Sequence, residues 1–152
     1  PFNHIGPGQS VDFVTASFAR QIALIEAGKQ AAQLKVGNLQ AERDFLDVRD
    51  VCNAYSKLLQ LADQEATYPR CFNISSGQPR KIQTMLDTLL GLTEQSIEIV
   101  EDPERMRPSD IPSASGNSDA IYQATGWKPA FNLHDTLNDL LADWRTQVSL
   151  TS

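Results

Sequence analysis

The chain has 152 residues, of which 41% are hydrophobic and 21% charged, values typical of a soluble globular domain with one ordinary core. Its formal net charge of -6 argues against a nucleic-acid-binding face, because such a face needs clustered Lys and Arg. No stretch approaches the length of a membrane span and no signal segment opens the chain, so neither nucleic acid nor a membrane is an expected partner.

Helix and strand signals alternate in the first third of the chain. Residues 1–3 are expected to end a strand, and after a loop a helix is predicted from its N-cap, Ser10, to about Gly28. One face of that helix carries the apolar residues Val11, Val14, Phe18, Ile22 and Ile25. Two short alternating runs, 33–36 and 43–46, predict strands.

The clearest helix signal follows Asp47, its predicted N-cap, and continues down to Asp63. Its apolar positions, at helical spacing, are Val48, Val51, Cys52, Tyr55, Leu58, Leu59 and Ala62. A strand is expected over 71–74, closed by a Ser-Ser-Gly turn, and an amphipathic helix over 82–90 ends at Gly91.

The last third contains a predicted strand at 97–100 and a proline-rich loop or linker at 102–115. Two helices are expected after it, at 119–125 and at 133–148, the second capped by Asn132. The alternation of strands and helices favours an α/β architecture. The residues after the proline-rich segment are too few to form a core of their own, so the chain is expected to form one unit.

The two cysteines, Cys52 and Cys71, are far apart in the sequence and have no metal-binding spacing. Both stand among apolar neighbours, which predicts reduced core residues. Reduced cysteines favour a cytoplasmic location.

The opening P-F-N-H-I-G-P-G-Q-S raises the question of a phosphate-binding loop. Gly6 and Gly8 fit the start of a G-x-G-x-x-G fingerprint, but Val11 stands at the third glycine position. A tight turn is therefore the favoured interpretation, and a phosphate cradle at a helix start is the alternative.

Six segments of the chain carry a resemblance to a known family. They are PFNHIGPGQS, FARQIALIEAG, VGNLQAERDFLDVRDVCNAY, FNISSG, DPERMRPSDIP and TGWKPAFNLHDTLNDLLADW. In this order they resemble the second half of the extended short-chain dehydrogenase/reductases that act on nucleotide sugars. Within that family they are most similar to the GDP-6-deoxy-D-mannose reductase and GDP-mannose 4,6-dehydratase branches.

The resemblance implies the C-terminal part of an NAD(P)-binding Rossmann fold, joined to a small mixed α/β substrate-binding domain. In the family, an N-terminal Rossmann half carries the glycine fingerprint and a Tyr-x-x-x-Lys pair. No tyrosine of this chain is followed four residues later by lysine. We therefore expect residues 1–152 to be one fragment of an NADP(H)- or NAD(H)-dependent enzyme, inactive without the other half.

Three predicted site residues lie in the opening segment. The resemblance places Asn3 at the substrate diphosphate and His4 at the nicotinamide end of the cofactor. Gln9 stands where the dehydratases carry an arginine that reaches the cofactor, and this difference favours the reductase branch. From the residues alone, Asn3 closes a turn and His4 is a surface residue.

Six further residues are assigned to the substrate. The resemblance places Arg43 at the nucleotide, Arg107 at the diphosphate and Asp110 at the ribose hydroxyls, while Leu34, Val36 and Asn38 border the base. The fork of an arginine and the acceptor oxygens of a carboxylate suit a diphosphate and a diol. Without the resemblance, these residues form a solvated charge cluster and a plain strand.

The sequence therefore predicts the GDP-sugar-binding portion of a GDP-4-keto-6-deoxy-D-mannose reductase or a GDP-mannose 4,6-dehydratase. The alternatives are a stand-alone binding or structural module and a fragment of a UDP- or dTDP-sugar epimerase or dehydratase. The expected partners are a GDP-sugar, the N-terminal Rossmann half and further copies of the chain, because an unpaired strand edge and an uncovered apolar patch favour association.

Overall fold

The computed structural model describes residues 1–62, 71–106 and 111–151. Its strands are β1 (Asn3–Ile5), β2 (Gln33–Val36), β3 (Glu42–Asp47), β4 (Pro79–Lys81), β5 (Glu98–Glu101) and β6 (Ser113–Ala114). Its helices are α1 (Val14–Glu26), α2 (Val48–Ala62), α3 (Ile82–Leu90), α4 (Asp119–Thr125) and α5 (Leu133–Leu150), with a 3-10 turn η1 at Pro103–Arg105. The architecture is mixed α/β, as the sequence predicts.

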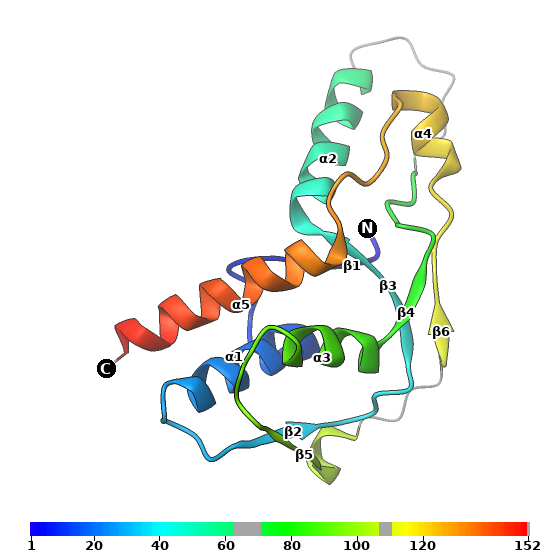
Figure 1. Cartoon of the computed structure of the whole chain (residues 1–152). Helices are drawn as coiled ribbons and strands as arrows, with labels where there is room; N and C mark the ends of the chain where they lie inside the picture. Colours follow the sequence, from blue (N-terminus) through cyan, green and yellow to red (C-terminus); the bar gives the residue numbers. More distant parts are fainter. Residues whose placement is uncertain (63–70, 107–110, 152) are drawn as a thin grey trace.

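Strand β3 organises the sheet (Figure 1). It pairs in parallel with β1, where Asn3 lies opposite Phe45 and Ile5 opposite Asp47. It also pairs antiparallel with β4 and in parallel with β6. Strands β2 and β5 form a separate parallel pair below α1 and α3 in the view of Figure 1.

Two apolar clusters lie on opposite faces of β3. Phe45 belongs to a cluster with α1, α3 and α5, whereas the next residue, Leu46, packs with α2, α4 and Trp127. Successive side chains of a strand point to opposite faces, so a single strand contributes to both clusters. The carboxyl ends of β1 and β3 therefore lie between the two apolar clusters.

Most predicted elements are confirmed within a residue or two. Asn132 caps α5 as predicted, because its side chain accepts a hydrogen bond from the Asp135 N–H. The predicted cap at Ser10 is wrong: α1 has Phe13 as its N-cap, and residues 10–13 form a turn closed by the Phe13 N–H and the Ser10 carbonyl. Residues 71–74 are not a strand, although the Ile74 carbonyl accepts from the Phe2 N–H at 2.9 Å.

The prediction that the cysteines lie in the core is wrong. Cys52 and Cys71 are both exposed and unpaired. Helix α2 buries the face that carries Val51 and Ala54. Cys52, Tyr55 and Leu59 lie on its solvent-exposed side. The apolar stripe of α2 is thus wider than the surface that covers it. None of the described helices is both long enough and apolar enough to span a membrane.

Ion pairs tie α5 to the rest of the fold. Arg145 on α5 donates two hydrogen bonds of 2.7 Å to Glu26 at the end of α1. Arg49 on α2 donates to Asp47 at 2.6 and 2.8 Å and lies 2.9 Å from Asp139 on α5. These contacts join helices that are far apart in the sequence.

The same contacts perturb two carboxyl groups. Hydrogen bonds from Arg145 hold the pKa of Glu26 below its ordinary value, although partial burial opposes them. Burial raises the pKa of Asp47, but the hydrogen bonds from Arg49 and Thr136 outweigh it, and the resulting pKa is also lowered. Both groups are therefore easier to ionise in the folded chain than in the unfolded one.

Stability should accordingly fall in acid. A carboxyl whose folded-state pKa is lowered contributes stability that is present above its unfolded pKa and is lost as pH falls through its folded pKa. With ordinary values of 3.8 and 4.5, the urea midpoint should be steady near neutral pH and should drop below about pH 4. Asp47→Asn should weaken this pH dependence and exposed Asp87→Asn should not. An unchanged acid limb in Asp47→Asn would contradict the linkage.

Candidate functional site

The loop after β1 is a tight turn held by the protein itself. Gly8 has a φ of 81°, a left-handed conformation that favours glycine. Its N–H donates to a carboxylate oxygen of Asp143 on α5 at 2.8 Å, and the Gln9 N–H donates to the Gly6 carbonyl at 3.2 Å. A phosphate at these N–H groups would meet the Asp143 carboxylate, and α1 begins only at Val14. The structure thus supports the tight-turn interpretation.

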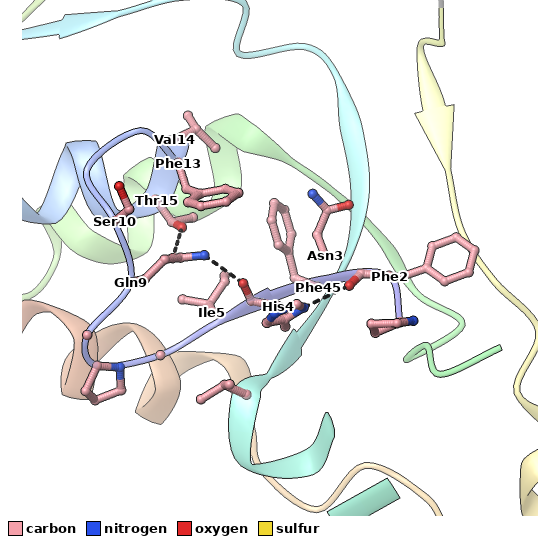
Figure 2. Close-up of a pocket in the computed structure, with 15 residues that line it drawn as sticks. Phe2, Asn3, His4, Ile5, Gln9, Ser10, Phe13, Val14, Thr15 and Phe45 are labelled. Atoms are coloured by element: carbon pink, nitrogen blue, oxygen red, sulfur yellow. Dashed lines mark hydrogen bonds between the residues drawn. The ribbon is translucent and has the colours of Figure 1, made fainter. Parts of the chain in front are cut away.

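A first hollow, of about 660 Å³, lies over this loop (Figure 2). It is lined by residues 1–10 together with Phe13, Val14, Thr15, Phe45 and Val48. None of the described residues lining it is Asp, Glu, Lys or Arg. Its polar side chains carry amides, hydroxyls and the His4 imidazole, so the side chains of the first hollow suit an uncharged ligand group.

His4 and Gln9, the two residues predicted to bind the cofactor, both line the first hollow. The exposed His4 ring lies 3.2 Å from the Phe2 carbonyl through Nδ1. Gln9 instead spans the loop: its amide donates to the His4 carbonyl at 2.8 Å and accepts from the Thr15 hydroxyl at 3.2 Å. Figure 2 shows the Gln9 side chain between these two partners, where it joins the end of β1 to the start of α1.

A second hollow, of about 420 Å³, adjoins the first. It is lined by residues of α1 and the loop before it, of the loop after β2, of β3 and of η1, together with Asn3 and Ile82. Its charged residues are Asp12, Arg43, Glu104 and Arg105. In contrast to the first hollow, the second therefore carries groups that recognise charged or strongly polar ligand atoms.

The two hollows share a wall formed by Asn3, Phe13, Val14 and Phe45. Asn3 and Phe45 are cross-strand neighbours on β1 and β3. Arg43 lies two residues before Phe45, and residues two apart on a strand point to the same face. A ligand in the second hollow that contacts Arg43 is thus next to the shared wall.

Of the remaining predicted substrate residues, Leu34 and Val36 lie outside both hollows. Leu34 and Val36 are completely buried in the apolar cluster between α1 and α3, and their side chains do not line the second hollow. Asn38, which the resemblance also places at the base, lines the second hollow together with Gly37. Arg107 and Asp110 lie outside the described residues.

Sequence reasoning missed one buried acid next to the site. Asp44 has 0% exposure, and its carboxylate accepts from the Ser76 N–H and hydroxyl, both at 2.7 Å. It also accepts from the N–H groups of Gly77 at 2.9 Å and Gly116 at 3.2 Å. Asp44 therefore fixes the backbone of β3 directly beside Arg43. Among the described residues, no cluster of His, Cys, Asp and Glu is suited to holding a metal ion.

Comparison with known proteins gives a consistent result over nearly the whole chain. Residues 1–140 match a family model described as GDP-mannose 4,6 dehydratase. The GDP-6-deoxy-D-mannose reductase of Pseudomonas aeruginosa is 43% identical over 148 residues, which are 97% of this chain and 47% of that protein. The human GDP-mannose 4,6 dehydratase is 23% identical across 92% of this chain and 41% of that protein. The chain spans about half the length of the curated relatives it matches.

Solved structures show the same fold. RMD from Pseudomonas aeruginosa, complexed with NADPH, matches with a TM-score of 0.85 and 41% identity over 95% of this chain and 46% of that chain. UDP-glucose 4-epimerase from Bifidobacterium longum, in complex with NAD+ and UDP, matches with a TM-score of 0.75 and 18% identity over 96% and 46% of the two chains. The second likeness shows the fold alone, and together the two confirm the predicted fold class.

Proposed function

Because the chain belongs to the GDP-mannose 4,6 dehydratase family, we propose that it forms the GDP-sugar-binding part of an NAD(P)-dependent GDP-4-keto-6-deoxy-D-mannose reductase. Identity of 43% to a GDP-6-deoxy-D-mannose reductase, against 23% to the human dehydratase, supports the reductase branch. The observation that carries the proposal is the pair of adjoining hollows, one uncharged and one charged, with a common wall.

A reductase of this kind must hold a nicotinamide against a sugar carbon while it binds the nucleotide diphosphate nearby. The first hollow fits a nicotinamide, because Phe13 and Phe45 offer apolar ring faces beside the amide of Asn3. The cofactor would supply the hydride when bound. This chain's own residues bind and orient: Gln9 fixes the loop under the first hollow, and Arg43 holds the substrate's anionic part in the second.

The nucleotide preference tests the proposal directly. The chain is titrated with GDP-mannose, UDP-glucose and dTDP-glucose, and binding is measured by calorimetry. The GDP-sugar should bind more tightly than the other two. Equal affinity for the three, or a preference for UDP-glucose, would contradict the assignment to GDP-sugars. Binding of none of them would contradict the wider proposal of a nucleotide-sugar site.

No reduction of a GDP-4-keto-6-deoxy sugar by NADPH is expected from these 152 residues alone. The sequence holds neither the glycine fingerprint nor a Tyr-x-x-x-Lys pair, so the group that protonates the substrate oxygen in this family is missing. The measurement is NADPH absorbance at 340 nm with the pure chain and the keto-sugar. Steady turnover above a no-protein control would overturn the expectation that the chain is an inactive fragment.

Self-association of the isolated chain is also expected. Leu59 and Tyr55, 72% and 46% exposed, form an uncovered apolar strip on α2, and surfaces of this kind favour association. Light scattering should give a mass of at least a dimer, and Leu59→Lys should shift it towards the monomer. A monomer at high concentration in the unmodified chain would contradict this prediction.

A further inference from the structure

We propose that Glu104 and Arg105 on η1 recognise the base of the nucleotide and select guanine. The inference rests on the proposed function, since it concerns the far end of the same second hollow. Both residues line that hollow, and they carry opposite charges at adjacent positions. The position of η1 relative to Arg43 and the shared wall decides which part of a sugar nucleotide these two residues meet.

The position of η1 is fixed by close packing on the end of β2. A Cβ atom at Gly37 would collide with the Arg105 carbonyl, so the two backbones approach as only a glycine allows. The Asp102 side chain accepts from the Glu104 N–H at 3.1 Å and so caps η1. The 3-10 turn is therefore held over the second hollow by its backbone.

The guanidinium of Arg105 is oriented from two sides. Its Nη1 donates to the hydroxyl of Ser17, a buried residue on α1, at 2.9 Å. Its Nε lies 3.6 Å from a carboxylate oxygen of Asp102. A guanidinium held in this way loses little conformational freedom when its remaining donors bind a ligand.

Part of the second hollow is shared with the first and part is not: Asn3, Phe13, Val14 and Phe45 line both hollows, whereas Ser17, Gly37, Glu104 and Arg105 line the second alone. The sugar must lie at the shared wall, next to the first hollow, and Arg43 follows on β3 to meet the diphosphate. The end formed by η1, Gly37 and Ser17 is then left for the base. The Glu104 carboxylate would repel a phosphate at that end, which also favours the base there.

An arginine beside a carboxylate matches one edge of guanine. The Watson–Crick edge of guanine presents the O6 acceptor next to the N1–H and N2–H₂ donors. Arg105 can donate to O6 while Glu104 accepts from N1–H and N2–H₂. Adenine places an amino donor opposite the arginine and a ring-nitrogen acceptor opposite the carboxylate, so both contacts become unfavourable.

The test measures the affinities for GDP and ADP by calorimetry, on the unmodified chain, on three variants of residues that line the second hollow and on one control variant. Glu104→Gln should weaken GDP binding roughly tenfold and leave ADP within about twofold, because one base contact is worth about that factor. Arg105→Gln should act in the same direction. Arg43→Ala should weaken GDP and ADP alike, because it removes a contact to the part that they share.

Glu104→Gln should not disturb folding, since η1 is capped through the main-chain N–H of residue 104, and its thermal midpoint is measured alongside. Glu101→Gln, an exposed change on β5 away from the hollow, is the matched control and should leave both affinities unchanged. If GDP binding depends on Arg43 but the ratio of GDP to ADP affinity is the same in Glu104→Gln, the base assignment is overturned. Absence of GDP binding, or its independence of Arg43, overturns the proposed function and the base assignment together.

Discussion

Replacing Asp44 by alanine is expected to lower the free energy of unfolding by about 1.5–3 kcal/mol, because a buried charged acceptor is removed from four donors. Ser76 and Gly116 are half-buried and Gly77 is exposed, so their N–H groups would lose a charged acceptor and regain only part of that interaction from water. Domains of this size have total stabilities of about 5–15 kcal/mol, so the loss is a measurable fraction of the total.

Urea unfolding followed by circular dichroism measures this effect, and Asp44→Asn separates its causes. The asparagine keeps the shape but turns an NH₂ group towards donors, so it should recover only part of the loss. Asp87→Ala, on the exposed face of α3, is the control and should change the free energy of unfolding by less than about 0.5 kcal/mol. A urea midpoint for Asp44→Ala within that margin would show that the loops do not depend on this carboxylate.

Asp44 also shows why sequence patterns predicted the elements better than the connections between them. Helical periodicity identified α2, α3 and α5, because a long apolar stripe is a local signal. The donors to Asp44 come from residues 76, 77 and 116, and no local pattern links them to β3. An acidic residue in a strand is normally taken as exposed, so its burial became visible only with the fold.

The short strands were missed for a different reason. Strand β6 has two residues and β4 has three, beginning with Pro79, so neither gives an alternating run. Both pair with the first residues of β3 and thereby support the backbone at Arg43. On α2 the error was of the opposite kind, because the sequence predicted burial for a residue that is exposed. Cys52 belongs to the apolar stripe, but periodicity does not show which part of a stripe another element covers.

For the candidate site, the structure shows which of the predicted residues line a hollow, and their roles stay predictions. Asn3, His4, Asn38 and Arg43 line the hollows, but Leu34 and Val36 are core residues. Side chains alternate along a strand, so Leu34 and Val36 share one face of β2. That face is the buried one. The opposite charges of Glu104 and Arg105 gave no signal, because adjacent opposite charges are common on solvated surfaces.

Arg43→Ala is expected to weaken GDP binding by roughly tenfold to a hundredfold, because one bidentate contact to a phosphate is worth about 1.5–3 kcal/mol. Arg43 is half-buried at the start of β3, and its Nη1 donates to the Glu42 carbonyl at 2.6 Å, which fixes the direction of the guanidinium. Arg43→Lys keeps the charge without the planar fork, so it should fall between alanine and the unmodified chain.

Three comparisons decide whether this loss reports ligand contact. Arg20→Ala, an exposed change on α1 away from both hollows, should leave GDP affinity unchanged. Arg107→Ala is expected from the sequence to act like Arg43→Ala, and the urea midpoint of each variant separates lost contacts from lost folding. Guanosine, which has no phosphate, should bind the unmodified chain and Arg43→Ala with the same affinity. If Arg43→Ala weakened guanosine as much as GDP, the residue would support the hollow without contacting the diphosphate.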